Sequence, residues 1–254
     1  MSRRRNGFLG LGLMCVIGAG FCGWNLYQEL IPRIKAEQGY DMIRAMAFNG
    51  GNTEFGLSGE AQDSRILPDF DALMAWNPDI RGWIWGPDTD IDYPVVQGSD
   101  NDYYLDHTTD REKSIIGSIF IESKNRGDFY DDVTVLYGHH IKGGRMFSSL
   151  AGYKEQSYYE LHPILYLYTP EANYRVELFA GHVLNGVTDE FPLDFESEEK
   201  RQDWIGQLVN SSTFTGGKEP GVNERILALC TCSYEYQNAR YVVYGVLRAM
   251  DENV

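Results

Sequence analysis

Downstream of residue 80 the hydrophobic positions fall into short runs, separated by glycine, proline, asparagine and aspartate. Runs of this kind, rich in β-branched and aromatic side chains, are typical of β-strands. Eight segments have this composition: Gly82–Trp85, Asp92–Gln97, Gly117–Glu122, Asp132–Tyr137, Ile164–Thr169, Tyr174–Val183, Arg225–Thr231 and Arg240–Arg248. Their spacing predicts a mainly β fold, closed into a barrel or stacked as a sandwich, rather than alternating βαβ units.

Helical periodicity interrupts this pattern. Ser197 is a favourable N-cap residue, acidic side chains occupy the next turn, and an apolar stripe extends to Val209, which predicts a helix before the strand that ends near residue 231. A shorter helix is expected over Asp69–Ala75. Residues 25–48 have apolar positions at loosely helical spacing and predict one or two further helices. The glycine-rich stretch 49–65 marks a flexible link.

The N-terminus has the pattern of a membrane anchor. Three arginines, Arg3 to Arg5, precede an uncharged run from Gly7 to Leu26, and about 20 apolar residues span a bilayer as a helix. The basic flank predicts a cytoplasmic N-terminus. A cleaved signal peptide is the alternative. The expected plan is a cytoplasmic tail at 1–6, a transmembrane signal-anchor at 7–27, an extracellular helical stalk and linker at 28–67, and a catalytic domain at 68–254, which gives a single-pass location in the cell membrane.

Charge and motifs exclude several classes of partner. The formal net charge is -15, and because nucleic-acid binding depends on Lys and Arg neutralising phosphates, nucleic acid is not expected as a partner. No H-E-x-x-H, C-x-x-C or carboxylate cluster with metal-ligand spacing is present. We therefore expect no metal and no other cofactor.

The positions of the cysteines indicate a catalytic thiol rather than structural disulfide bonds. Cys15 and Cys22 lie in the expected anchor, whereas Cys230 and Cys232 are two residues apart near the C-terminus, too close for an unstrained disulfide. Cys232 follows a strongly apolar strand and precedes a polar loop, a position from which sheets commonly present catalytic groups. A free cysteine has a pKa of about 8.5, so a nucleophile needs a basic or cationic neighbour. A buried, inert thiol is the alternative interpretation.

Two residues are candidates for those neighbours. His139 follows the strand ending at Tyr137 and a glycine, Gly138, that would let the chain turn and present the imidazole. The next side chain, His140, should point to the other side. Arg240 opens the last strand, and a hairpin with the preceding strand would place its guanidinium beside Cys232, where it could stabilise a thiolate or an oxyanion.

Together these residues resemble the sortase family. The segment Leu229-Cys230-Thr231-Cys232 is similar to the family signature TLxTC, Gly138-His139 resembles its histidine turn, and Arg240 follows in the family's order. Class B sortases in particular are similar to the segments N-P-D-I-R-G-W-I, D-Y-P-V-V-Q and D-N-D-Y-Y-L, and to the helix before the cysteine strand. The resemblance covers roughly residues 70 to 250. Two positions depart from the signature: Ala228 replaces its threonine, and Cys230 occupies its variable position.

The resemblance implies an eight-stranded β-barrel that cleaves a C-terminal sorting signal after threonine and transfers the protein to an amino group of a peptidoglycan precursor. It implies Cys232 as nucleophile, His139 as proton donor and Arg240 as the holder of substrate or oxyanion. Further residues that resemble the substrate groove, or lie in the signature itself, are Asn101, Leu105, Tyr137, Cys230 and Thr231. The expected partners are surface proteins bearing sorting signals, the wall-precursor amine, and the membrane through the anchor, as suits a Gram-positive bacterium.

Two other functions remain alternatives at this point. One is a different extracellular cysteine enzyme, such as an L,D-transpeptidase or a papain-like peptidase, although the order of histidine, cysteine and arginine argues against both. The other is a catalytically silent β-barrel that binds the cell wall or a partner protein.

Overall fold

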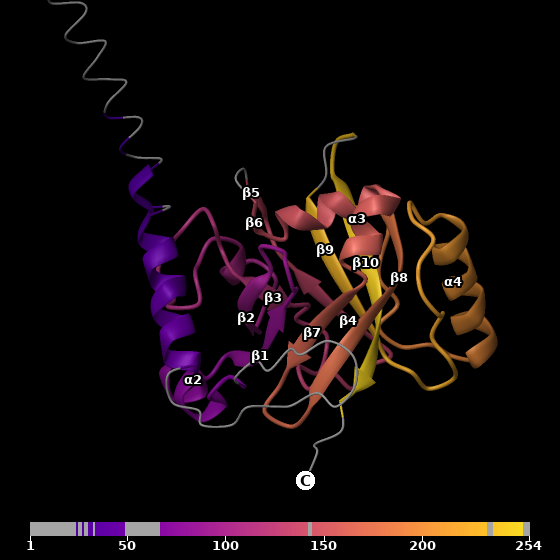
Figure 1. Cartoon of the computed structure of the whole chain (residues 1–254), viewed down its shortest axis with the longest axis horizontal. Helices are drawn as coiled ribbons and strands as arrows, with labels where there is room; N and C mark the ends of the chain where they lie inside the picture. The colour runs from indigo at the N-terminus through magenta and orange to yellow at the C-terminus, as the bar shows by residue number, and fades with distance from the viewer. Residues whose placement is uncertain are drawn as a thin grey trace, which may run out of the picture.

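A computed structural model describes residues 24, 27, 30–32, 34–48, 67–141, 144–232 and 236–250, and its centre is a closed β-barrel (Figure 1). The eight strands predicted from the sequence are all present, in the barrel order β1-β2-β3-β4-β9-β10-β8-β7. Their bounds are β1 Ile80–Trp85, β2 Asp92–Val96, β3 Ile119–Ile121, β4 Val133–Tyr137, β7 Ile164–Tyr168, β8 Asn173–Asn185, β9 Ile226–Cys232 and β10 Ala239–Ala249. The predicted mainly β barrel is therefore confirmed.

Strand pairing brings distant parts of the chain to one end of the barrel. β9 pairs antiparallel with β10, in a register that sets Arg240 opposite Cys232. On its other edge β9 runs parallel to β4, where Tyr137 is opposite Cys230. The ends of these three strands thus carry the candidate cysteine, the segment leading to the candidate histidine, and the candidate arginine.

Both predicted helices in the barrel domain form. Helix α2 (Phe70–Trp76) is capped by Asp69, whose side chain accepts from the Ala72 N–H at 2.9 Å. Helix α4 (Glu198–Asn210) is capped by Ser197, which accepts from the Lys200 N–H at 3.3 Å. Several short elements were not predicted, because each is too short to show a period: η1 Tyr103–Leu105, β5 His140–Ile141, β6 Arg145–Met146, η2 Ser148–Lys154 and α3 Gln156–Leu161.

Hydrophobic side chains form two clusters, one on each side of the barrel wall. The larger fills the barrel and includes Trp83, Phe120 and Leu229. The smaller lies between the wall and α4, where Ile205 and Leu208 pack with strand residues. Figure 1 shows α4 flanking β8 on the outside of the barrel. Burial of one apolar stripe explains why α4 is stable as a surface helix.

The N-terminal helix, residues 34–48, packs along the barrel (Figure 1). Ala36, Tyr40, Ile43 and Ala47 are buried and belong to the same cluster as the barrel interior. Positions spaced by three and four residues lie on one face of a helix, so this face is the one that contacts the barrel. The link expected at 49–65 lies outside the described residues.

The predicted single-pass membrane location is contradicted by the structure. Among the described residues, no helix has both the length and the apolar character needed to cross a bilayer. Apart from Trp24 and Tyr27, the segment expected to form the anchor, 7–27, lies outside the described residues.

Candidate active site

A pocket of about 500 Å³ lies where β4 and β9 end and β10 begins. All eight residues singled out from the sequence line it: Asn101, Leu105, Tyr137, His139, Cys230, Thr231, Cys232 and Arg240. The opposite wall comes from the end of β8 and the segment after it and includes Leu184, Phe191 and Leu193, which sequence reasoning did not select. Apolar walls with a few convergent polar groups are typical of binding pockets.

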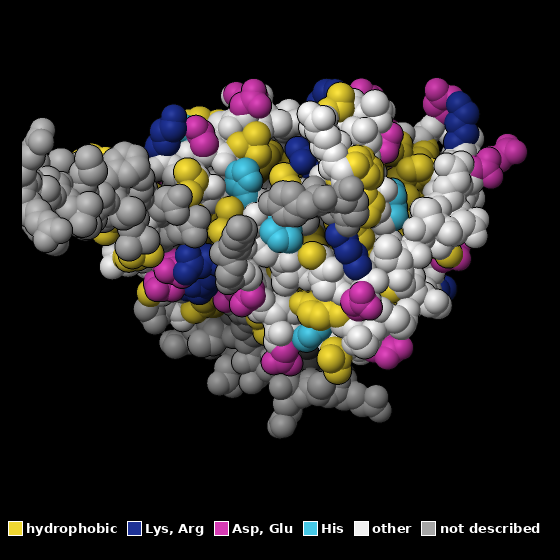
Figure 2. Space-filling model, turned by 90° about the horizontal axis from the view of Figure 1, so that it is seen from above, with side chains coloured by type: hydrophobic (Ala, Val, Ile, Leu, Met, Phe, Trp, Pro, Cys, Tyr) yellow, Lys and Arg dark blue, Asp and Glu magenta, His cyan; other side chains and the backbone are white. Residues whose placement is uncertain are grey.

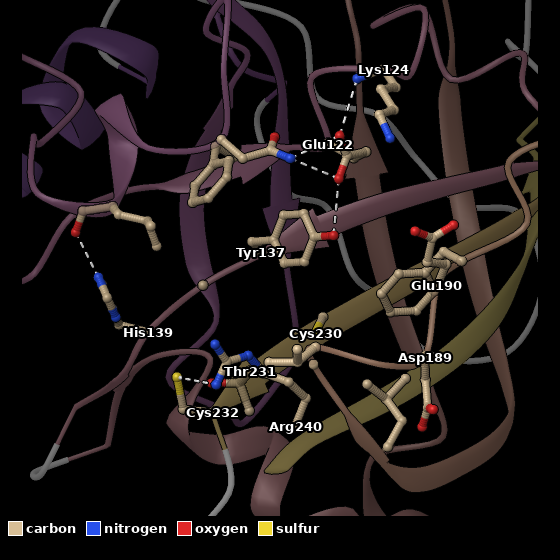
Figure 3. Close-up of a pocket in the computed structure, with 18 of the residues that line it drawn as sticks. Glu122, Lys124, Tyr137, His139, Asp189, Glu190, Cys230, Thr231, Cys232 and Arg240 are labelled. Atoms are coloured by element: carbon tan, nitrogen blue, oxygen red, sulfur yellow. Dashed lines mark hydrogen bonds between the residues drawn. The ribbon is translucent and has the colours of Figure 1, made fainter. Parts of the chain in front are cut away.

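Cys232 and Arg240 are in direct contact at one end of this pocket (Figure 3). The Nη1 atom of Arg240 donates to Cys232 Sγ at 3.2 Å, as the antiparallel pairing of β9 and β10 requires. Interaction with His139 lowers the pKa of Cys232 most; burial opposes this shift, and the Arg240 charge adds to it. The thiolate, which is the nucleophilic form, is thereby favoured.

His139 is held from the other side by a backbone carbonyl. Its Nε2 atom lies 2.6 Å from the Leu105 carbonyl oxygen, and because a carbonyl only accepts, Nε2 carries a proton. The pKa of His139 is raised, chiefly by Cys232, with burial opposing the shift and the Leu105 carbonyl adding to it. The surroundings therefore favour an imidazolium beside a thiolate.

Gly138 is required for space rather than for a special backbone angle. It is not among the described glycines with positive φ. A Cβ at this position would be 2.5 Å from Ile119 Cδ1 and 2.7 Å from Phe147 Cδ2. The Gly138 N–H also donates to the Cys230 carbonyl at 3.1 Å, which ties the end of β4 to β9. The neighbouring His140 pairs with Met146 in the β5–β6 hairpin and does not line the pocket, as expected.

A buried carboxylate, Glu122, organises the far wall of the pocket and was not singled out from the sequence. Both of its oxygens accept from Asn101 Nδ2 at 2.8 Å, and one accepts from the Tyr137 hydroxyl at 3.0 Å (Figure 3). Burial alone would raise the pKa of Glu122, but the hydrogen bonds, led by that of Asn101, lower it below its ordinary value. The sequence feature that could have pointed to Glu122 is its position directly after the apolar strand Ile119–Ile121.

The two residues before Cys232 are almost fully enclosed. Cys230 is 2% exposed, and burial raises the pKa of its thiol to about 12. The Thr231 side chain is also 2% exposed, and its Oγ1 atom is buried without a hydrogen-bond partner in the described structure. Of these two thiols, only that of Cys232 is partly exposed and has a lowered pKa, two properties that favour reactivity.

Two further features of the described residues concern surface charge and metal ligands. On the face shown in Figure 2, Lys and Arg side chains stand in small separate groups among acidic, hydrophobic and histidine side chains. Among the described residues, no group of three or more His, Cys, Asp or Glu side chains is placed to hold a metal ion.

Comparison with known proteins finds the same family throughout. A family model for the sortase domain matches residues 86–248. Sortase B of Listeria monocytogenes is 34% identical over 246 residues, which is 94% of this chain and 97% of that protein. The crystal structure of sortase B from Bacillus anthracis in complex with AAEK1 has a TM-score of 0.74 at 27% identity, covering 87% of this chain and 99% of that one. A sortase B–substrate complex from Staphylococcus aureus has a TM-score of 0.68 at 31% identity, covering 72% and 85% of the two chains.

Proposed function

The chain belongs to the sortase family of cysteine transpeptidases, class B, and we propose that it cleaves a C-terminal sorting signal after threonine and transfers the protein to an amino group of a peptidoglycan precursor. Membership of the family makes the protein a cell-wall sorting transpeptidase. Cleavage after threonine and the peptidoglycan acceptor are what membership of the family implies. Acyl transfer through a thiol is supported by one arrangement: Arg240 Nη1 lies 3.2 Å from Cys232 Sγ, and His139 interacts with the same thiol in one pocket.

In the first half of the reaction, the Cys232 thiolate attacks the carbonyl carbon of the threonine. The resulting oxyanion is stabilised by the Arg240 guanidinium, a fixed cation that needs no reorganisation. When the C–N bond breaks, the His139 imidazolium gives its proton to the departing amine. A thioester between Cys232 and the threonine carbonyl remains, and His139 is left neutral.

In the second half, the acceptor amine attacks the carbonyl carbon of the thioester. Neutral His139 takes the proton that this amine loses, and the C–S bond breaks to release the Cys232 thiolate. The imidazolium–thiolate pair is thereby restored. The raised pKa of His139 and the lowered pKa of Cys232 both favour this resting pair.

The pocket walls suggest how the predicted groove residues act. The Leu105 side chain is 40% exposed at the pocket, so it offers apolar contact to a sorting peptide. The Asn101 amide is committed to Glu122, and its Oδ1 atom accepts from the Ser123 N–H at 2.8 Å. Tyr137 is likewise bonded to Glu122. Asn101 and Tyr137 therefore serve the sorting peptide mainly as a shaped wall.

The test is cleavage of fluorogenic sorting peptides of the NPxTx, LPxTG and PPxTG types by the full chain. Wild type should cleave one of them and form a thioester that mass spectrometry assigns to Cys232, whereas Cys232→Ala should form none. The matched variant is Cys230→Ala, which should still form the thioester. Cleavage by Cys232→Ala, or no cleavage of any peptide, would reject the proposal in favour of a different cysteine enzyme or a silent binding barrel.

A further inference from the structure

A tyrosine on the N-terminal helix reaches the catalytic end of the barrel. Tyr40 is 5% exposed, and its hydroxyl donates to the Gly117 carbonyl at 2.7 Å. Its ring packs edge-on against Tyr93, with ring centroids 5.3 Å apart. Tyr40 lies outside the residues matched by the sortase-domain model, 86–248. A helix beyond that match thus supplies a buried hydrogen bond to the segment that precedes β3.

The segment that Tyr40 holds lies directly behind His139. Gly117 has a φ of 61°, a conformation that favours glycine. A Cβ there would be 2.6 Å from the Leu105 carbonyl oxygen and 3.0 Å from His139 Cδ2. The Ser118 N–H donates to the Tyr104 carbonyl at 2.9 Å, which joins this segment to the one that ends at Leu105. The carbonyl that accepts from His139 Nε2 is therefore packed against the backbone that Tyr40 bonds.

From this chain of contacts we propose that Tyr40 is a positioning residue for His139. By fixing the Gly117 carbonyl, it holds the backbone against which the Leu105 carbonyl rests, and so keeps the imidazole directed at Cys232. The inference rests on the proposed role of His139 as proton donor and acceptor. It assigns the N-terminal helix a part in catalysis besides burial of its apolar face.

The positioning role of Tyr40 can be distinguished from a direct effect of charge on the pKa of His139. The ionisable groups that face Tyr40 are Tyr93 and Asp110, whereas those that face His139 are Cys232 and Arg240. Replacing Tyr40 with phenylalanine removes a neutral hydroxyl and leaves every charge near His139 in place. A change in the pH dependence of Cys232 or His139 would therefore report a change in geometry.

The chain offers a matched control in Tyr153. Its hydroxyl donates to the His162 carbonyl at 2.8 Å, its side chain is fully buried, and it does not line the pocket. Tyr153→Phe and Tyr40→Phe thus each remove one hydrogen bond from the hydroxyl of a buried tyrosine to a backbone carbonyl; the Tyr153 bond is partly buried and the Tyr40 bond fully buried. Any general loss of stability should be similar in the two variants, whereas only one of them should reach the active site.

The experiment measures peptide cleavage and the pH dependence of Cys232 alkylation by iodoacetamide in the full chain. We expect kcat/KM of Tyr40→Phe to fall roughly tenfold, since small displacements of a catalytic group are costly, and that of Tyr153→Phe to stay within about twofold. Loosening the Leu105 contact should lower the pKa of His139 and weaken its pairing with Cys232. The alkylation profile of Tyr40→Phe should therefore move to higher pH.

Two results would overturn the inference. If Tyr40→Phe keeps the wild-type pH profile and kcat/KM, or if both tyrosine variants change alike, Tyr40 only stabilises the fold. Cys232→Ala and His139→Ala belong in the same panel. Cleavage surviving in either would overturn the proposed function and this inference together, whereas its loss in both, with Tyr40→Phe unaffected, would overturn this inference alone.

Discussion

The hydrogen bonds of Glu122 allow us to predict how much its substitution lowers the free energy of unfolding. Its carboxylate accepts from Asn101 and Tyr137, and also from the Ser123 hydroxyl and the Lys124 N–H, both at 3.2 Å. Glu122→Gln keeps the side-chain volume but turns charge-assisted hydrogen bonds into neutral ones. Since each bond to a charged group contributes about 1 kcal/mol more than a neutral one, and partners can partly rearrange, we expect a loss of about 2 kcal/mol in the free energy of unfolding at pH 7.

The pH dependence of this loss gives the sign of the effect. The pKa of Glu122 is lowered in the folded protein from its ordinary value of 4.5. A carboxylate with a depressed folded-state pKa stabilises the fold above its unfolded pKa, and this stabilisation disappears as the pH falls through the folded value. The difference between wild type and Glu122→Gln should therefore be greatest near neutral pH and should shrink below pH 4.5.

Urea denaturation at several pH values is the assay, with the midpoint and slope recorded for each protein. Glu190→Gln is the matched control, because Glu190 is an exposed carboxylate that lines the same pocket, and exposed substitutions usually change stability by less than about 0.5 kcal/mol. A Glu122→Gln protein as stable as wild type at pH 7, or a deficit that stays constant as the pH is lowered, would refute the reasoning.

Three further substitutions test the geometry around the thiol. Arg240→Ala should move iodoacetamide alkylation of Cys232 to higher pH, because the guanidinium lowers the pKa of the thiol, and should reduce kcat/KM by about 10²-fold or more; a wild-type alkylation profile would contradict this. Gly186→Ala places a Cβ 2.8 Å from Arg240 Cγ, so kcat/KM should fall by about tenfold with little change in melting temperature. Gly138→Ala collides with Phe147 and should lower the free energy of unfolding by about 2 kcal/mol, measured by urea denaturation.

Local composition predicted the strands because each one buries at least one face. The eight runs of β-branched and aromatic residues correspond to the eight barrel strands within a few residues at each end. The predicted hairpin between β9 and β10 also has the expected pairing, with Arg240 opposite Cys232. The parallel pairing of β4 with β9, which brings Tyr137 beside Cys230, depends on closure of the whole barrel. No local pattern encodes it.

The three candidate catalytic residues were selected from their motifs, whereas the groups that contact them were not. The atom that holds His139 is the backbone oxygen of Leu105, and a backbone carbonyl has no signature in the sequence. Tyr40, on a helix that is remote along the chain, bonds the Gly117 carbonyl in the segment that packs against Leu105. Gly138 was expected to let the chain turn, but it has no positive φ; what the structure shows there is close packing by Phe147, a contact that only the folded structure reveals.

Under the proposed mechanism, the contacts of Glu122 would link substrate binding to proton transfer. Through Tyr137 the carboxylate holds the end of β4, which leads directly into His139. Through Asn101 it holds the loop that continues to Leu105, whose carbonyl accepts from the same imidazole. Both segments that position His139 therefore converge on one wall of the peptide pocket. Because a displaced wall would also displace the imidazole, substitutions in this wall should change kcat together with KM.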